Sequence, residues 1–177
     1  MKATGIVRRI DDLGRVVIPK EIRRTMRIRE GDPLEIYTDR EGGVIFKKYS
    51  PIADITTFAG DICASLYSAC GFFCAICDSD TVLAYSGNGK KDVLEKNISP
   101  ELEELLESRK CYIAENNDVR LTSDKSSPAV VCACPVIISG DVIGIITFIE
   151  TQGKKASDTE SKLLSAAAAF LSRQLEA

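Results

Sequence analysis

Five arginines near the amino terminus are the residues of this sequence best suited to binding chemistry. They are Arg8, Arg9, Arg15, Arg23 and Arg24. A guanidinium group stays charged and can donate two parallel hydrogen bonds to phosphate oxygens or to a guanine edge. Residues 1–29 carry nine Lys and Arg against three Asp and Glu, a local charge of +6 in a chain whose net charge is −3. This basic module predicts a polyanionic partner, of which double-stranded DNA is the favoured one.

A turn, two strands and a short helix are expected to position these arginines. Asp11–Gly14 has the composition of a turn, and it separates two strand-like runs, Thr4–Ile10 and Arg15–Ile18. Pro19 suits the first position of a helix, because the N–H that proline lacks would have no partner there. The helix that follows carries the last two arginines of the set.

The rest of the amino-terminal segment predicts a β-hairpin. Leu34–Thr38 and Val44–Lys48 alternate in polarity on either side of Gly42 and Gly43. A segment of about 50 residues built from short strands buries little apolar surface alone, and it has no disulfide or metal to compensate. Its open strand edges also need a partner. We therefore expect a homodimer, in which two copies share one core and double the positive charge on one surface.

Charge divides the chain into two parts. Residues 1–50 hold 12 basic and 8 acidic side chains, a net charge of +4, whereas residues 51–177 hold 11 and 18, a net charge of −7. Such asymmetry suggests two modules with different partners. Ser50 and Pro51 mark the boundary, so the predicted domains are residues 1–50 and 51–177.

The second domain is expected to have an α+β fold. The predicted elements are a helix over Ile52–Cys70, strands over Phe72–Cys77 and Thr81–Tyr85, an acidic helix over Glu101–Glu107, a strand over Tyr112–Glu115, a polar loop over Asn116–Ser127, strands over Ala129–Ile138 and Val142–Glu150, and a helix over Ser157–Leu175. Ser99 is placed to cap the acidic helix, and Ser157 with Glu160 resembles a capping box. This order predicts an antiparallel sheet with flanking helices, the first and last helices sharing one face.

Catalytic and metal-binding residue types are sparse. The chain has no histidine, which removes the usual general base and the commonest metal ligand, so we expect no enzyme and no catalytic residues. The seven cysteines are expected to be reduced thiols of a cytosolic protein. Cys74 and Cys77, with Cys132 and Cys134, could together supply four thiolates to zinc. Both pairs lie inside strand-like runs, so core packing is favoured and no metal site is expected.

Other polar segments are interpreted as surface features. Asp78 with Asp80, and the run Glu101–Glu107, suit a turn and a solvated helix face better than a cation site. Ser86–Lys91 lacks the spacing of a phosphate-binding loop, so a surface loop is expected. The longest apolar run, Val142–Ile149, is far shorter than the about 20 residues of a membrane span. With no visible secretory signal, the sequence predicts a cytoplasmic protein that does not contact membranes.

The segment Gly14–Ile36, read as GRVVIPKEIRRTMRIREGDPLEI, resembles the DNA-binding domain of the AbrB-like transition-state regulators. The likeness extends from Met1 to about Lys48. It implies a swapped-hairpin β-barrel formed by two interleaved chains. It also implies DNA contacts from the arginines at positions 8, 15, 23 and 24, with Arg9 at a position that is often lysine in relatives. Arg27 and Arg29 are weaker candidates, since they could pair with nearby acids.

The carboxy-terminal half resembles a GAF domain in architecture and length. It lacks the signatures of cyclic-nucleotide and chromophore sites, so no cofactor is expected and an unknown small-molecule effector is left open. The small residues Ala166–Ala169 could let the last helix pack on its own sheet, form an interface with a second chain, or do both. A homotetramer, with dimers linked through this half, is the expected assembly.

The resemblance implies a DNA-binding transcription regulator of spore development. It would act on forespore-expressed genes as both activator and repressor, associated with the nucleoid. A dimer with few base-reading side chains is expected to show a degenerate site preference. The alternative is an antitoxin-like swapped-hairpin module that binds a partner protein, with a purely structural second domain. A full second domain argues against this alternative, because antitoxins usually append only a short disordered tail.

Overall fold

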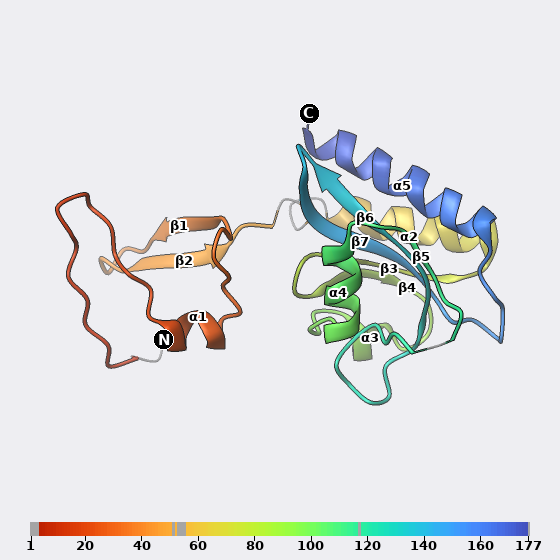
Figure 1. Ribbon diagram of the computed structural model, residues 1–177, viewed down its shortest axis with the longest axis horizontal. Helices are drawn as coiled ribbons and strands as arrows, with labels where there is room; N and C mark the ends of the chain where they lie inside the picture. Colours follow the sequence, from red (N-terminus) through yellow and green to blue (C-terminus); the bar gives the residue numbers. More distant parts are fainter. Residues whose placement is uncertain (1–3, 51, 53–55, 117, 177) are drawn as a thin grey trace. The chain divides into compact units, whose positions relative to one another are not determined.

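The computed structural model describes residues 4–50, 52, 56–116 and 118–176 (Figure 1). The chain forms two compact units, Met1–Tyr49 and Ser50–Ala177. The first is called the basic unit and the second the sheet unit. Within the described residues, no helix is both long and apolar enough to span a bilayer.

The basic unit contains helix α1 (Lys20–Thr25) and the antiparallel strands β1 (Leu34–Thr38) and β2 (Val44–Lys48). The predicted hairpin is confirmed. Asp39 closes it, because its Oδ1 accepts hydrogen bonds from the N–H groups of Glu41 at 3.0 Å and Gly43 at 2.6 Å. A Cβ at Gly43 would lie 2.5 Å from Asp39 Oδ2, so a larger residue there would displace the carboxylate that closes the turn.

The two strands expected at the start of this unit do not form in the single chain. Residues 4–10 and 15–18 are extended runs that meet at the turn over 11–14 (Figure 1). The N–H of Asp11 donates to the carbonyl of Arg15 at 3.0 Å beside the turn. Regular strand structure requires a neighbouring strand that takes up the remaining N–H and C=O groups. Among the residues that the structure describes, no strand pairs with these runs, which is why strand-like composition alone misleads here.

The sheet unit alternates helices with antiparallel strands. Its elements are α2 (Thr56–Cys70), β3 (Phe73–Cys77), β4 (Val82–Ser86), α3 (Lys90–Val93), α4 (Pro100–Ser108), β5 (Tyr112–Ile113), β6 (Val130–Ile138), β7 (Asp141–Ile149) and α5 (Asp158–Glu176). The strand order is β4-β3-β7-β6-β5, with every neighbouring pair antiparallel. The predicted α+β class and the sheet with helices are therefore confirmed.

Two hydrophobic clusters lie on opposite faces of this sheet. On one face, α2 and α5 pack over Phe148 and its neighbours, and the rings of Phe58 and Phe170 are 5.7 Å apart. On the other face, α3, α4 and the loop before β6 cover a cluster that includes Leu102 and Ile145. Figure 1 shows α2 and α5 side by side, which confirms the prediction for the first and last helices of this unit.

Helix ends in the sheet unit follow the predicted caps. Ser99 Oγ accepts from the N–H of Leu102 at 3.1 Å and donates to the carbonyl of Arg120 at 2.7 Å. The N–H of Ser157 donates to Glu160 Oε2 at 2.8 Å. Hydrogen bonds from the side chain and then the backbone of Ser157 lower the pKa of the Glu160 carboxyl. Local hydrogen bonding thus sets where α4 and α5 begin.

One segment differs in type from its sequence prediction. The glycine-rich segment expected to be a surface loop ends in helix α3, whose first turn is stabilised by the N–H of Asp92 donating to the carbonyl of Gly89 at 2.9 Å. Helix α2 is described from Thr56 to Cys70, and residues 53–55 of the predicted helix lie outside the described residues.

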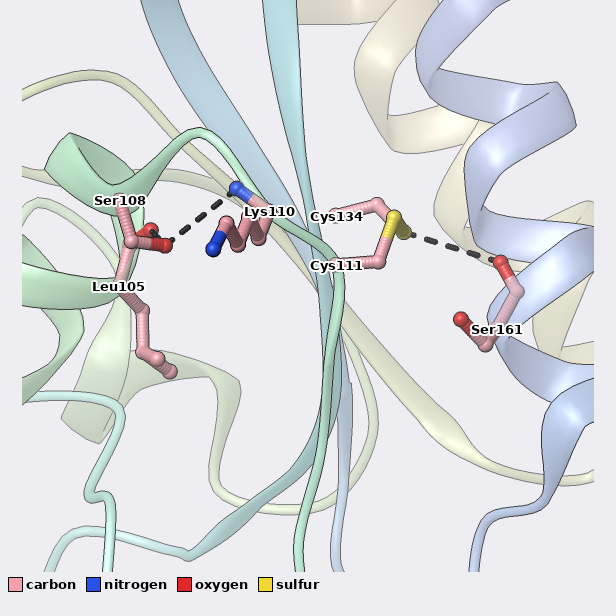
Figure 2. The surroundings of a disulfide bond; sticks show 6 residues. All are labelled: Leu105, Ser108, Lys110, Cys111, Cys134 and Ser161. Atoms are coloured by element: carbon pink, nitrogen blue, oxygen red, sulfur yellow. Dashed lines mark hydrogen bonds between the residues drawn. A yellow bond between two sulfur atoms is a disulfide. The ribbon is translucent and has the colours of Figure 1, made fainter.

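The expectation that all seven cysteines are reduced thiols is wrong for two of them. Cys111 and Cys134 form a disulfide (Figure 2). The pairing of β5 with β6 is the reason: Tyr112 faces Ala133, so the residues one step outward, Cys111 and Cys134, face each other with their Cα atoms 4.2 Å apart. Sequence periodicity alone does not contain this register.

The five remaining cysteines are free, and four of them are buried. Burial raises the pKa of the Cys74 and Cys77 thiols well above the ordinary value, and raises the pKa of Cys132 to about 11. Neutral, buried thiols of this kind pack as small apolar side chains. This agrees with the packing role that the sequence favoured for them.

Candidate nucleic-acid interface

Arg15 is held in place by the acidic residue that opens the preceding turn. Asp11 Oδ1 accepts from the N–H groups of Arg15 at 2.8 Å and Leu13 at 3.0 Å. Its second oxygen, Oδ2, accepts from Arg15 Nε at 2.8 Å. Gly14 completes the turn with a φ of +77°, a left-handed conformation that glycine adopts without steric cost.

This arrangement leaves most of the Arg15 guanidinium available. The side chain is 70% exposed, and only one of its five N–H donors is used by Asp11. Hydrogen bonds from Arg15, first from its backbone N–H and then from its side chain, lower the pKa of Asp11. The carboxylate therefore stays ionised at neutral pH and orients a cation whose outer edge remains open to an anion.

Arg8 and Arg9 lie on the extended run before the turn, and both are exposed. Arg8 makes a local contact, with Nη1 donating to the carbonyl of Val7 at 3.4 Å. Side chains on an extended run point alternately to opposite sides. Arg8 and Arg9 are therefore not equivalent, and a flat ligand on one side would meet one of them first.

Arg23 and Arg24 lie on α1 and differ in exposure. The helix starts directly after Pro19, and the N–H of Arg23 donates to the Pro19 carbonyl at 2.9 Å. Arg24 is exposed, whereas Arg23 is half-buried and its Nε is buried without a hydrogen-bond partner among the described residues. The five predicted arginines thus occupy three segments: an extended run, the end of a turn, and a short helix.

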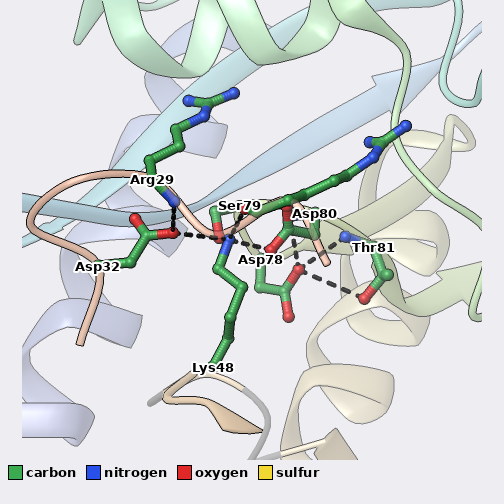
Figure 3. A network of polar contacts seen from close by, with 8 residues as sticks. Arg29, Asp32, Lys48, Asp78, Ser79, Asp80 and Thr81 are labelled. Atoms are coloured by element: carbon green, nitrogen blue, oxygen red, sulfur yellow. Dashed lines mark hydrogen bonds and ion pairs between the residues drawn. The ribbon is translucent and has the colours of Figure 1, made fainter. Parts of the chain in front are cut away.

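The weaker candidates Arg27 and Arg29 belong to a separate polar cluster in the basic unit. Asp32 Oδ2 accepts from the N–H of Arg29 at 2.8 Å and lies 3.2 Å from Lys48 Nζ (Figure 3). Lys48 Nζ also donates to the carbonyl of Arg27 at 3.1 Å. Asp32 therefore links the end of β2 to the segment after α1, and this role is structural.

Asp78 and Asp80 of the sheet unit form the turn between β3 and β4, as expected. Asp78 Oδ1 accepts from the N–H groups of Asp80 at 2.8 Å and Thr81 at 2.7 Å (Figure 3). A carboxylate that accepts from backbone N–H groups two and three residues onward is a common turn device. These hydrogen bonds show that Asp78 stabilises the turn, which explains why an aspartate occupies this position.

The basic unit has an unusual distribution of apolar side chains. Pro19 is the single buried residue among the described residues 4–49, and none of the Val, Ile, Leu, Met, Phe and Tyr side chains there is buried. Val7 is 85% exposed, Leu13 74% and Val17 70%. All three lie on or beside the run–turn–run segment that carries Arg8, Arg9 and Arg15.

Comparison with known proteins identifies the family. A family model described as stage V sporulation protein T C-terminal, transcription factor, matches residues 54–176. Stage V sporulation protein T of Bacillus subtilis (strain 168) is 49% identical over 99% of this chain and 99% of its own length. The chain belongs to the stage V sporulation protein T family. The predicted function, a DNA-binding transcription regulator, is confirmed by this membership.

Other similarities divide between the two units. The transition state regulatory protein AbrB of Bacillus subtilis (strain 168) is 65% identical to this chain over 51 residues. The matched segment makes up 29% of this chain and 52% of AbrB. A solution structure of the N-terminal DNA recognition domain of AbrB also matches 29% of this chain. The match covers 94% of that structure, with a TM-score of 0.26. A family model described as antidote-toxin recognition MazE, bacterial antitoxin, matches residues 7–54.

The fold is shared with a solved fragment of another protein over about two thirds of the chain. Residues 122 to 287 of a methyl-accepting chemotaxis protein match 68% of this chain and 88% of that fragment, with 17% identity and a TM-score of 0.54. Identity at this level shows a common fold and nothing about ligands.

Asp11 is a site residue that sequence reasoning missed. By residue type it is one of three acids in the basic segment, but its side chain holds the Arg15 turn together. The signal was available, because an aspartate that starts a turn commonly accepts from the N–H two residues on. An acidic residue four positions before an arginine, across a Gly-containing turn, is the pattern that would have found it.

Proposed function

We propose that Arg8, Arg9, Arg15, Arg23 and Arg24 are the residues through which this transcription regulator contacts duplex DNA. The observation that carries the proposal is Arg15, which is held at its Nε by Asp11 while its side chain stays 70% exposed. A pre-oriented guanidinium gives up less conformational freedom when it binds a phosphate or a guanine edge. The local excess of positive charge supports the remaining four positions.

The proposed DNA-binding form is a homodimer built on a swapped-hairpin barrel. Val7, Leu13 and Val17 are too exposed for a stable free unit, and burying each such side chain would contribute about 1.5–3 kcal/mol. Pairing with the same runs of a second chain would cover them and would complete the strands that a single chain leaves unformed. Two copies of the arginine set would then share one surface.

The biological role that we propose follows the family. The protein would regulate genes of spore development, in the forespore, as both activator and repressor, and it would work in the cytoplasm at the nucleoid. The sheet unit would act as a GAF-like module for sensing and assembly, and its exposed α5 residue Phe170 (46%) suits an interface that links dimers into a tetramer.

Salt-dependent duplex binding tests the arginine assignment. Arg15→Ala and Arg23→Ala should weaken binding, and the slope of log K against log salt should flatten by about 0.9 for each phosphate that the variant no longer neutralises. Lys162→Ala, on α5 of the sheet unit, removes the same charge elsewhere and should leave the slope unchanged. Affinity and slope that match the wild type in both arginine variants would overturn the assignment.

An antitoxin-like role is the second candidate, favoured by the match of residues 7–54 to the MazE antitoxin model. In that role the basic unit would bind a partner protein, and the sheet unit would be purely structural. Full-length similarity to a transcription factor favours the first role. Wild-type protein without salt-dependent duplex binding would favour the second.

A further inference from the structure

The Cys111–Cys134 disulfide borders a cavity of about 420 Å³ in the sheet unit. Its walls come from β6, from the carboxy-terminal half of α5, and from the segment between α4 and β5. The volume lies within the range of small-molecule sites, about 300–1,000 Å³, so a compact molecule fits beside the disulfide. The residues used below all border this cavity, and they are Arg109, Cys111, Cys134, Arg173 and Glu176.

The two cysteines of this disulfide differ in exposure. Cys111 is an exposed residue, whereas Cys134 is only 1% exposed. A thiolate cleaves a disulfide by attacking one of its two sulfur atoms, and access helps to decide which sulfur is attacked. The geometry therefore favours attack at Cys111, with Cys134 as the sulfur that leaves. Exposed disulfides are also the labile ones, in contrast to buried structural disulfides.

The structure holds a hydrogen-bond acceptor for the sulfur that would leave. Cys134 Sγ lies 3.7 Å from the carbonyl oxygen of Ser161 on α5 (Figure 2). A disulfide sulfur carries no proton and has nothing to donate to this carbonyl, whereas a thiol would donate to it. Exchange therefore turns a contact between two acceptors into a hydrogen bond, which stabilises the released Cys134 in its buried position.

The charges around the cavity indicate which small thiol it would accept. Arg109 and Arg173 border the cavity and are both exposed, and Glu176 supplies the single carboxylate among the described residues that line it. The Glu176 carboxylate is engaged elsewhere, because its Oε1 accepts from the N–H of Ser139 at 3.4 Å. Two guanidinium groups against one carboxylate favour an anionic molecule, and a guanidinium can bind a carboxylate through two parallel hydrogen bonds.

We propose that this cavity is a thiol-exchange site, where a small thiol that carries a carboxylate forms a mixed disulfide with Cys111. The thiolate of the small molecule attacks Cys111 Sγ, and the new S–S bond forms as the Cys111–Cys134 bond breaks. Cys134 leaves as a thiolate and takes up the proton that the small thiol has lost, so the exchange needs no further oxidant or reductant. The carboxylate of the adduct lies beside Arg109 and Arg173. This site is independent of the proposed DNA contacts.

Exchange rates of the oxidised full chain with three small thiols, measured by mass spectrometry of acid-quenched samples, test the charge preference. Mercaptopropionate, mercaptoethanol and cysteamine have similar lengths and are anionic, neutral and cationic. Dividing each rate by that of the same thiol with hydroxyethyl disulfide corrects for differences in thiol pKa and nucleophilicity. We expect the corrected rate of mercaptopropionate to exceed that of mercaptoethanol by about two- to fivefold, and cysteamine to be slowest. The net charge of the chain is −3 and would by itself give the opposite order. Equal corrected rates, or any order in which mercaptopropionate is not the fastest, would overturn the proposal.

Charge variants test the roles of the two arginines. Arg109→Gln and Arg173→Gln should each lower the preference for mercaptopropionate by about twofold, whereas Glu176→Gln should raise it. Lys162→Gln removes the same charge from α5 at a position that does not border the cavity, and it should keep the wild-type preference. A loss of preference in Lys162→Gln equal to that in the arginine variants would mean general charge attraction and would overturn the site.

Variants that keep one cysteine of the pair locate the adduct. Cys134→Ala leaves Cys111 as a thiol, and Cys111→Ala leaves Cys134 as a thiol. Treatment with dithiodipropionate, followed by peptide mass mapping, should show a stable adduct at Cys111 in the first variant and no adduct at Cys134 in the second. An adduct at Cys134, or an unmodified Cys111, would overturn the assignment. The rate comparison on the wild-type chain uses neither variant, so it tests the proposal even where a variant fails to fold.

Discussion

Asp11 accepts hydrogen bonds from both the backbone N–H and the side-chain Nε of Arg15, each at 2.8 Å. One carboxylate therefore sets the shape of the turn and the direction of the guanidinium that follows it. In a unit whose proposed partner is polyanionic, an acidic side chain is part of the binding geometry. This relationship allows the contributions of charge and of orientation to be measured separately.

Replacing Asp11 should weaken DNA binding even though it removes a negative charge. Asp11→Ala releases the Arg15 guanidinium and opens the turn, and we expect affinity to fall by about three- to tenfold, near 1 kcal/mol. Asp12→Ala removes the same charge from the next residue and should bind as tightly as the wild type or more tightly. Fluorescence anisotropy with a labelled duplex measures both. Tighter binding by Asp11→Ala would mean that Asp11 acts only as a repulsive charge.

The Asp11 carboxyl should titrate below the ordinary value of 3.8, because hydrogen bonds from Arg15 lower its pKa. A lowered pKa means that these hydrogen bonds stabilise the turn fully above pH 3.8 and that this stabilisation disappears as pH falls through the folded-state pKa. Carbon-detected NMR of the carboxyl group measures the midpoint. In Arg15→Ala the midpoint should rise only part of the way, because alanine keeps the backbone N–H that is the largest cause. A full return to 3.8 would contradict that order of causes.

Gly144 in the central strand β7 should tolerate no side chain. A Cβ there would lie 2.3 Å from the carbonyl oxygen of Cys77 and 2.5 Å from Ile52 Cδ1. Gly144→Ala should therefore lower the free energy of unfolding by about 1–3 kcal/mol through overpacking. Gly60→Ala in α2 meets nothing within 4 Å and should raise it by about 0.5–1 kcal/mol. Urea unfolding followed by circular dichroism measures both, and equal stabilities would contradict this packing account.

The Cys111–Cys134 disulfide should make the stability of the sheet unit depend on reductant. In the chain-entropy account, closing a loop with a sequence separation of 23 contributes up to about 3 kcal/mol. Cys111→Ser, at an exposed position, should lower the unfolding free energy of oxidised protein by about that amount and have little effect in dithiothreitol. Cys70→Ser is the control, because Cys70 is a free cysteine outside the disulfide. Wild-type stability that is unaffected by reductant would contradict the prediction.

Local sequence patterns predicted the elements that are stabilised by hydrogen bonds between residues close together in the sequence. The β1–β2 hairpin depends on Asp39 and the glycines after it, and α4 depends on the cap at Ser99. In these cases a few neighbouring residues supply both the hydrogen bonds and the turn conformation. The same holds for the candidate site, since the arginine-rich segment is recognisable from residue types alone.

Features that depend on register or on a partner were not predictable in this way. The Cys111–Cys134 pairing requires knowing that β5 lies beside β6 at one particular offset. A cavity of about 320 Å³ that Phe73, Asp92 and Thr122 border requires that β3, α3 and the loop before β6 converge, although these residues are far apart in the chain. Residues 4–10 and 15–18 have strand-like composition, but strand structure there needs a neighbour that the single chain does not provide.

The disulfide also determines what proteolytic cleavage of the loop before β6 would do to the chain. Cys111 and Cys134 close a covalent ring, and the loop residues Thr122 and Asp124 lie inside it. A protease that cuts one peptide bond between the two cysteines would leave both fragments joined through sulfur. The cut would become visible as two polypeptides only after reduction, so oxidised protein could survive a break in this loop without separating into pieces.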